Sequence, residues 1–228
     1  MRNIAIIGLG GFGSALAREL TEKGVEVLAI DQKREPVEAI KDTVTHAVTL
    51  NSTDEEALCA VDIQNVDVAV VCIGKDIEAN LLTTILLKKL GIHRIWTRAL
   101  GPLQQEIIKT LEVENIINLE EEMGSIVASS LASANIVRHI PLSKGHSIIE
   151  VKLAKDFVGK TLRTLDLRNK YSVNVIAIKR KVPAITDQGE RILEDLIDDI
   201  PNPDDILNET DSLLVVGSTK NVEHFSTR

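Results

Sequence analysis

The beginning of the chain most constrains its fold, because a strand, a glycine-rich turn and a helix follow one another directly. The apolar residues 4–7 lead into Gly8-x-Gly10-x-x-Gly13, and a helical pattern follows over 14–23. Gly8 permits a tight turn, Gly10 lets a phosphate group approach the backbone, and Gly13 lets the helix pack closely on the sheet. The free N–H groups and dipole at the start of such a helix favour an anion. The pattern is typical of a nucleotide-binding unit.

A carboxylate follows at the distance that a dinucleotide site requires. Residues 25–30 form a second expected strand, and Asp31 ends it eighteen residues after Gly13. A carboxylate there accepts hydrogen bonds from both hydroxyls of an adenosine ribose, and its charge disfavours a 2′-phosphate. The alternative is a tight turn without a ligand, and the strand, helix and acid together argue against it.

Strands and helices continue to alternate through the first half of the chain. Further strands are expected at 47–49, 66–73, 94–97 and 115–118, and helices at 34–42, 53–61, 77–90 and 102–111. Thr53 and Glu56 form an expected capping box at the start of the helix over 53–61. The alternation predicts an α/β fold, a Rossmann-type doubly wound parallel sheet with ligands beyond the carboxyl ends of its strands.

The candidate cofactor-binding residues lie at these strand ends. Arg98 has two interpretations, a phosphate contact or a surface arginine paired with a carboxylate. The full set is Gly8, Gly10, Gly11, Phe12, Gly13, Asp31, Asn51, Ser52, Thr53, Ile73, Gly74 and Arg98.

The pattern changes after the sixth expected strand. Three acids, Glu120 to Glu122, precede an amphipathic helix expected over 120–137. Acids at a helix start interact favourably with its dipole, and a divalent cation site at Glu120 is the alternative. The helix has no place in the predicted sheet, which indicates a crossover or dimerisation element.

The last part of the chain predicts a small α+β domain. Expected strands lie at 147–153, 173–178 and 213–216, helices at 162–167 and 218–225, a hairpin turn at 179–183 and an extended acidic loop at 188–203. So small a core is marginal by itself, so we expect it to pair with a second copy.

Composition excludes several function classes. A formal charge of −8 gives no basic surface for nucleic acid, and the longest apolar runs are far shorter than the roughly 20 residues of a membrane-spanning helix. Without a leader pattern, and with Cys59 and Cys72 expected as small hydrophobic side chains, a cytoplasmic protein is expected. The five histidines form no catalytic motif, and this favours a sensor over a dehydrogenase.

A resemblance to a known family rests on segments spread over the chain, namely residues 7–13, 30–31, 46–48, 72–80, 82–84, 95–99, 120–124 and 211–217. In these segments, and over nearly its whole length, the chain is similar to KtrA- and TrkA-type regulatory subunits of bacterial potassium uptake channels. These are the RCK, or KTN, proteins.

The resemblance implies a non-enzymatic gating subunit with a Rossmann domain over 1–119, a crossover helix over 120–140 and an RCK C domain over 141–228. ATP or ADP, or NAD(H), would bind in the Rossmann cleft, and Glu120 would help to hold Mg²⁺ or Ca²⁺ at a dimer interface. Cyclic di-AMP would bind between two C-terminal domains near Arg168 and Asn174. Dimers would assemble into an octameric ring beneath a KtrB- or TrkH-like channel subunit, at the inner face of the membrane.

One residue departs from the family pattern. Gly11 stands where many KtrA proteins carry an arginine that reaches a neighbour's γ-phosphate, so the discrimination of ATP from ADP stays open. Two alternatives to the gating subunit also stay open, an NAD-dependent oxidoreductase and an NAD(H) redox sensor.

Overall fold

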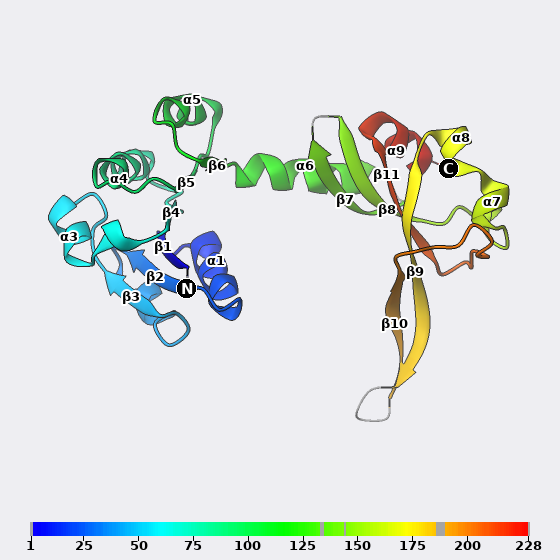
Figure 1. Ribbon diagram of the computed structural model, residues 1–228, viewed down its shortest axis with the longest axis horizontal. Coiled ribbons are helices and arrows are strands. Elements are labelled where there is room, and N and C mark those ends of the chain that lie inside the picture. Colours follow the sequence, from blue (N-terminus) through cyan, green and yellow to red (C-terminus); the bar gives the residue numbers. More distant parts are fainter. Residues whose placement is uncertain (1, 133–134, 144, 186–189, 228) are drawn as a thin grey trace. The chain divides into compact units, whose positions relative to one another are not determined.

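The chain folds into two compact units, Met1–Glu121 and Glu122–Arg228. The computed structural model describes residues 2–132, 135–143, 145–185 and 190–227. Each unit has its own sheet, a 6-stranded sheet in the first and a 5-stranded sheet in the second (Figure 1).

The first unit confirms the predicted doubly wound α/β fold. Every strand pair of its sheet is parallel, and the strand order is β3-β2-β1-β4-β5-β6. The order reverses between the neighbours β1 and β4, where such sheets bind ligands. Its strands are β1 (Asn3–Ile7), β2 (Glu26–Asp31), β3 (His46–Thr49), β4 (Val68–Val71), β5 (Ile95–Arg98) and β6 (Asn115–Ile117), and its helices are α1 (Gly11–Glu22), α2 (Arg34–Glu38), α3 (Glu55–Ala60), the short η1 (Ile63–Asn65), α4 (Ile77–Lys89) and α5 (Pro102–Thr110).

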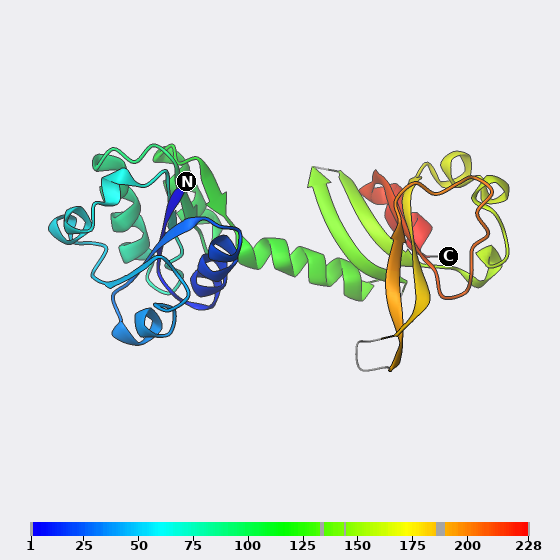
Figure 2. The same cartoon turned by 60° about the horizontal axis from the view of Figure 1, so that its bottom comes forward.

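The central strands are apolar on both faces because helices cover both. Ile4 and Ile6 of β1 pack with α1 and α2, whereas Ala5 and Ile7 pack on the opposite face with α3 and α4. Figures 1 and 2 show α1 on one side of the sheet and α4 on the other. Burial on both faces explains why these strands appear in the sequence as continuous apolar runs.

The second unit is an antiparallel sheet with short helices. Its strand order is β10-β9-β11-β8-β7, and its core includes Phe157 and Phe225, whose rings stack at 6.0 Å between centroids. Helix α6 (Leu119–Ala132) begins in the first unit and continues into the second. The other elements are β7 (Ile136–Ser143), β8 (His146–Lys152), η2 (Lys155–Phe157), α7 (Leu162–Leu165), α8 (Leu167–Tyr171), β9 (Asn174–Ile185), β10 (Arg191–Asp198), β11 (Ser212–Ser218) and α9 (Thr219–Ser226).

The prediction of a helix over 120–137 is wrong at its C-terminal end. Helix α6 ends at Ala132, and β7 begins at Ile136 and pairs with β8. β-Branched residues such as Ile136 and Val137 favour a strand, and pairing with β8 gives their backbone groups partners. Pro141, expected to end the crossover segment, lies inside β7.

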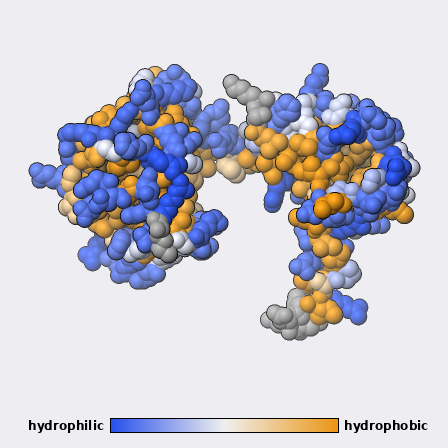
Figure 3. Space-filling view, in the orientation of Figure 1, coloured by the Kyte–Doolittle hydropathy of each residue, from blue (hydrophilic) through white to orange (hydrophobic). Residues whose placement is uncertain are grey.

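The hairpin turn expected at 179–183 and the extended acidic loop expected at 188–203 are also wrong. Residues 179–183 continue β9, and Arg191–Asp198 pairs with it as β10, while residues 188 and 189 lie outside the described residues. Cations on β9 neutralise Asp195 within the strand, since its carboxylate contacts Lys179 at 2.7 Å and Lys181 at 3.4 Å. The two strands form an arm with exposed apolar side chains such as Leu193 and Ile197 (Figures 1 and 3).

The capping box expected at Thr53 and Glu56 is wrong as well. Asp54 caps α3, since its Oδ1 accepts hydrogen bonds from the backbone N–H groups of Glu56 at 3.0 Å and Ala57 at 3.2 Å. The helix begins one residue later than expected, so an aspartate, among the preferred N-cap residues, occupies the capping position. The Thr53 hydroxyl donates instead to Oδ1 of Asn51 at 2.9 Å.

We predict that Gly13→Ala destabilises the first unit by about 3 kcal/mol or more, because the added Cβ would lie 2.0 Å from the carbonyl oxygen of Gly8. Gly11→Ala is the matched control, since a Cβ there meets nothing within 4 Å. Trp96, the single tryptophan of the sequence, reports unfolding of this unit by fluorescence during urea denaturation. Equal stability of the two variants would contradict the prediction.

We predict that the β9–β10 arm loosens in acid. The pKa of Asp195 lies below its ordinary value, mainly because Lys179 donates a hydrogen bond to the carboxylate. The charged carboxylate therefore stabilises the arm at pH values above the ordinary pKa of about 3.9. This stabilisation is lost as the pH falls through the lower pKa of the folded state. Hydrogen exchange of the arm amides, corrected for intrinsic rates, measures this. Asp195→Asn should reduce protection at neutral pH and remove its acid dependence. In the described part of the chain Glu194 forms no ion pair, so Glu194→Gln should resemble the wild type.

Candidate functional site

A cleft of about 690 Å³ lies beyond the carboxyl ends of the parallel strands, at the reversal between β1 and β4. It brings together most of the residues that the sequence singled out. Phe12, Gly13 and Thr53 are not among those that line it, and Phe12, in α1, packs against the core. The predicted residues on its wall are Gly8, Gly10, Gly11, Asp31, Asn51, Ser52, Ile73, Gly74, Arg98 and Glu120.

The glycine turn has the form that a phosphate site needs. Gly8 has φ +97°, and a Cβ there would lie 3.0 Å from the backbone nitrogen of Ile73. Gly10 and Gly11 face open space, and Gly10 caps α1 without a side-chain hydrogen bond. The first N–H groups of a helix have no partner within it. An anion in the cleft therefore meets unscreened donors and a backbone that it can approach closely.

The Asp31 carboxylate is held in a fixed orientation at the end of β2. Its Oδ2 accepts the N–H of Leu9 at 2.7 Å, and its Oδ1 accepts the N–H of Lys33 at 2.8 Å. Each oxygen keeps a second lone pair. The carboxylate is thus oriented and still able to accept two hydroxyl groups, as an adenosine ribose would require.

Arg98 at the end of β5 crosses the floor of the cleft. Its guanidinium pairs with Glu120 and lies over Gly74, where an added Cβ would be 2.5 Å from Nη1. The Arg98 side chain is only 17% exposed, and its buried Nε has no hydrogen-bond partner within the residues that the structure describes. The pairing with a carboxylate is therefore present. Arg98 also lines the cleft, so a phosphate there would compete with Glu120 for the guanidinium.

Cys72 contributes an uncharged part of the cleft wall. Burial raises the pKa of its thiol to about 12, although the charge of Arg98 acts in the opposite direction. The thiol therefore stays protonated at neutral pH and is no nucleophile.

Sequence reasoning missed Asn80 of α4 as a site residue. Its side chain is fully buried and donates to the carbonyl oxygens of Ile73 at 2.9 Å and Arg98 at 3.1 Å, both at the cleft. Thr83, one turn along α4, hydrogen-bonds to Ser52 at 2.8 Å. The signal for them is polar residues at positions 80, 83 and 84, one face of an otherwise apolar helix.

Glu120 does not form a metal site within one chain. Among the described residues no group of three histidine, cysteine or acidic side chains is arranged to hold a metal ion. Its carboxylate pairs with Arg98 instead. Further ligands for a cation would have to come from a second molecule or from a bound nucleotide.

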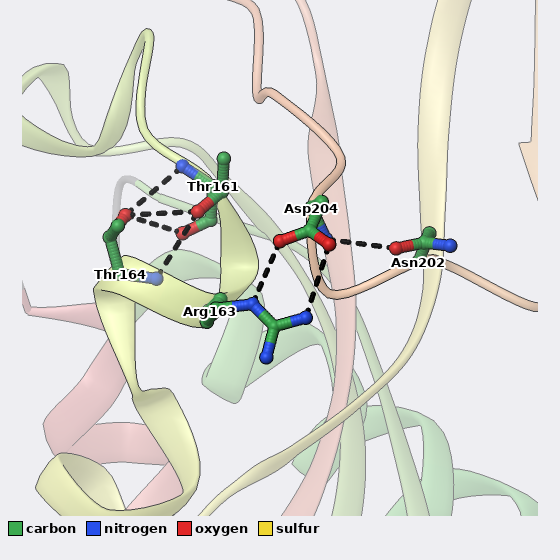
Figure 4. Close-up of polar contacts among 5 residues, drawn as sticks. All are labelled: Thr161, Arg163, Thr164, Asn202 and Asp204. Atoms are coloured by element: carbon green, nitrogen blue, oxygen red, sulfur yellow. Dashed lines mark hydrogen bonds and ion pairs between the residues drawn. The ribbon is translucent and has the colours of Figure 1, made fainter.

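Arg168 and Asn174 lie together in a second cleft, of about 430 Å³, in the second unit. Nε of Arg168 donates to Oδ1 of Asn174 at 2.8 Å. Figure 4 shows Arg163, which also lines this cleft, paired with Asp204 at 2.8 and 3.1 Å. This pairing lowers the pKa of Asp204 and neutralises one of the two arginines beside the cleft.

Within the described ranges, no helix combines the length and the apolar composition needed to span a lipid bilayer.

Comparisons with known proteins identify the domains of the chain. The TrkA-N domain model matches residues 4–119, and the TrkA-C domain model matches residues 147–228. The Ktr system potassium uptake protein A of Bacillus subtilis is 35% identical over 224 residues, which cover 98% of this chain and 95% of that protein.

Two solved structures of similar fold concern one protein, GsuK. Its RCK domain structure is 25% identical with a TM-score of 0.54, and the match covers 98% of this chain and 45% of that one. The structure of GsuK bound to ADP is 26% identical with a TM-score of 0.51, over 57% of this chain and 34% of that one. The two domain matches and the full-length likeness to a Ktr protein show that the chain belongs to the Ktr/TrkA family of potassium uptake proteins, of the RCK type.

Proposed function

We propose that the chain is a nucleotide-sensing regulatory subunit that gates a membrane potassium channel or transporter. The observation that carries the proposal is a cleft that holds Asp31, the glycine turn and Arg98 in one chain of the Ktr/TrkA family. No histidine belongs to the described lining of this cleft. A binding site without a histidine acid–base group supports a sensor rather than an enzyme.

The ligand that we propose is ATP or ADP, with NAD(H) as the alternative. Asp31 suits an unmodified adenosine ribose, and the similar GsuK structure is bound to ADP. Lys33 and Lys75 lie beside the cleft with Arg98, so three cations are available to phosphate groups. All of these residues line the cleft of the first unit, where the glycine turn would hold the phosphates.

The signal would pass through the Arg98–Glu120 ion pair. A nucleotide phosphate competes with the Glu120 carboxylate for the Arg98 guanidinium, and Glu120 lies in the first turn of α6, which continues into the second unit. A ligand shifts a conformational equilibrium only by its differential affinity for the two states. Coupling of about 1–3 kcal/mol per site is typical, and an oligomer adds several sites.

The partners that we propose are further copies of this chain and a KtrB- or TrkH-like channel subunit. Met123, Val127 and Leu131 of α6 expose 49%, 49% and 81% of their surfaces. A second α6 would cover these side chains, so dimers that build an octameric ring are the proposed assembly. Mg²⁺ or Ca²⁺ at Glu120 and cyclic di-AMP beside Arg168 and Asn174 would then be completed by a second copy, at the inner face of the membrane.

We predict that the assembled protein changes shape between its ATP- and ADP-bound forms, because the γ-phosphate adds charge beside Arg98 and Glu120. Small-angle X-ray scattering of the full chain, saturated with each nucleotide, measures the change. Identical curves for both forms would contradict the gating proposal.

Two other results would favour the alternative functions. Displacement of ATP by NADH at equal concentration, with a shape change driven by NADH alone, would favour the redox sensor. Turnover of NADH with a carbonyl compound would favour the oxidoreductase.

We predict that Asp31→Ala lowers the affinity for ADP about tenfold or more, because both ribose hydroxyls lose a charged acceptor. Calorimetry with ADP and 2′-deoxy-ADP supplies an internal control. The wild type should bind 2′-deoxy-ADP more weakly than ADP, whereas the variant should hardly distinguish them. A variant that keeps the wild-type preference would show that Asp31 does not contact the ribose.

A further inference from the structure

We propose that Asn80, which does not line the cleft, is the residue that positions Arg98 for the phosphate groups of the nucleotide. The inference rests on the proposed function, since it concerns the same cleft. Asn80 lies in α4 with none of its surface exposed, beneath the ends of β4 and β5. A buried side-chain amide with every hydrogen-bonding group engaged is rigid and selects one geometry.

The Asn80 side-chain amide connects β4 and β5 beyond the last hydrogen-bonded pair of these strands. The last paired residues of β4 and β5 are Val71 and Thr97. Beyond them, the Asn80 Nδ2 group joins the two chains by donating to the carbonyl oxygens of Ile73 and Arg98, at 2.9 and 3.1 Å. One planar group therefore fixes the separation of the two strand ends on which Gly74 and Arg98 sit.

The side-chain oxygen of Asn80 also has hydrogen-bond partners. Its Oδ1 accepts from Nε2 of Gln104 at 3.1 Å and from the Thr97 hydroxyl at 3.3 Å. Gln104 also accepts the N–H of Leu100 at 2.9 Å. The hydrogen bonds of Asn80 and Gln104 thus restrain the chain at three positions, which are Thr97, Arg98 and Leu100.

This restraint determines where the guanidinium lies. The space between Gly74 and Arg98 is too small even for a methyl group, because a Cβ on Gly74 would lie 2.5 Å from Nη1. A small shift of one strand end would therefore change how Arg98 presents its donors. Since arginine binds phosphate through a planar and directional fork, a misplaced fork loses affinity for the phosphate and not for the nucleoside.

The test compares adenosine with ADP, because only ADP carries the phosphates. Calorimetry on the full chain should show that Asn80→Ala weakens ADP binding about tenfold and adenosine binding less than about twofold. Thr84→Val is the matched control: it removes hydrogen bonds of the same buried network, to the Asn80 carbonyl at 2.7 Å and to Thr97 at 3.2 Å, and leaves the contacts to Arg98 in place. It should lower thermal stability and leave the ADP-to-adenosine ratio unchanged.

A double-mutant cycle with Arg98→Gln separates positioning from general damage. In the Arg98→Gln background, Asn80→Ala should change ADP affinity less than about twofold, because the residue that it positions is absent. Asn80→Ser replaces Asn80→Ala if the latter does not fold. Gly74→Ala should produce the same ADP-selective loss, by displacing the guanidinium while Asn80 keeps its hydrogen bonds.

Three results would overturn the positioning role: equal losses for adenosine and ADP in the Asn80 variant, additive losses in the cycle, or the same ADP-selective loss in Thr84→Val. A wild-type chain that binds ADP no more tightly than adenosine is a different failure. It would contradict the proposed function itself, because the cleft would then contribute nothing to phosphate binding.

Discussion

The structure of the first unit depends on the close contact between the start of α1 and the turn that follows β1. Only a glycine fits at position 13, because any Cβ there would overlap the carbonyl oxygen of Gly8. The contact brings the first N–H groups of the helix to the carboxyl end of the sheet, where β1 and β4 are neighbours and the strand order reverses. The proposed phosphate site lies at this approach, and the Asp31 carboxylate that we propose for the ribose accepts the N–H of Leu9 in the same turn.

The parts of this arrangement that could be predicted are those with local causes. Strands buried on both faces give continuous apolar runs, and the spacing of the glycines and of Asp31 is enough to locate the cleft. The role of Asn80 was not predicted because it depends on hydrogen bonds to the backbone of Ile73 and of Arg98, and Arg98 lies eighteen residues away in the sequence. A local sequence pattern does not show which residues form such pairs. The strand β10 was not predicted because an acidic segment is typical of a solvated loop. Its pairing depends on contacts of Asp195 with Lys179 and Lys181, which the sequence does not show. The early end of α6 likewise depends on pairing of β7 with β8.

Arg98 is the residue that we propose to take part in both nucleotide binding and regulation. Its charge is already balanced by Glu120, yet its buried Nε lacks a partner in the described part of the chain. A phosphate in the cleft would compete with the carboxylate at the start of α6 for the guanidinium. A phosphate that takes the guanidinium would leave Glu120, whose side chain is 50% exposed, without its partner, so occupied and empty clefts should differ in where Glu120 lies. A side chain would have room at Gly11, and without an arginine there we expect phosphate binding to depend more on Arg98.

We propose that nucleotide binding in this cleft regulates potassium movement across a membrane. The most direct measurement is potassium flux into liposomes that contain a Ktr-type membrane subunit and this chain, with ATP or ADP present. We expect flux with the wild-type chain to differ between the two nucleotides, and the difference to disappear with Glu120→Gln, which keeps the shape of the side chain and removes its charge. Equal flux with ATP, with ADP and without a nucleotide, from a chain shown to bind both, would contradict the account.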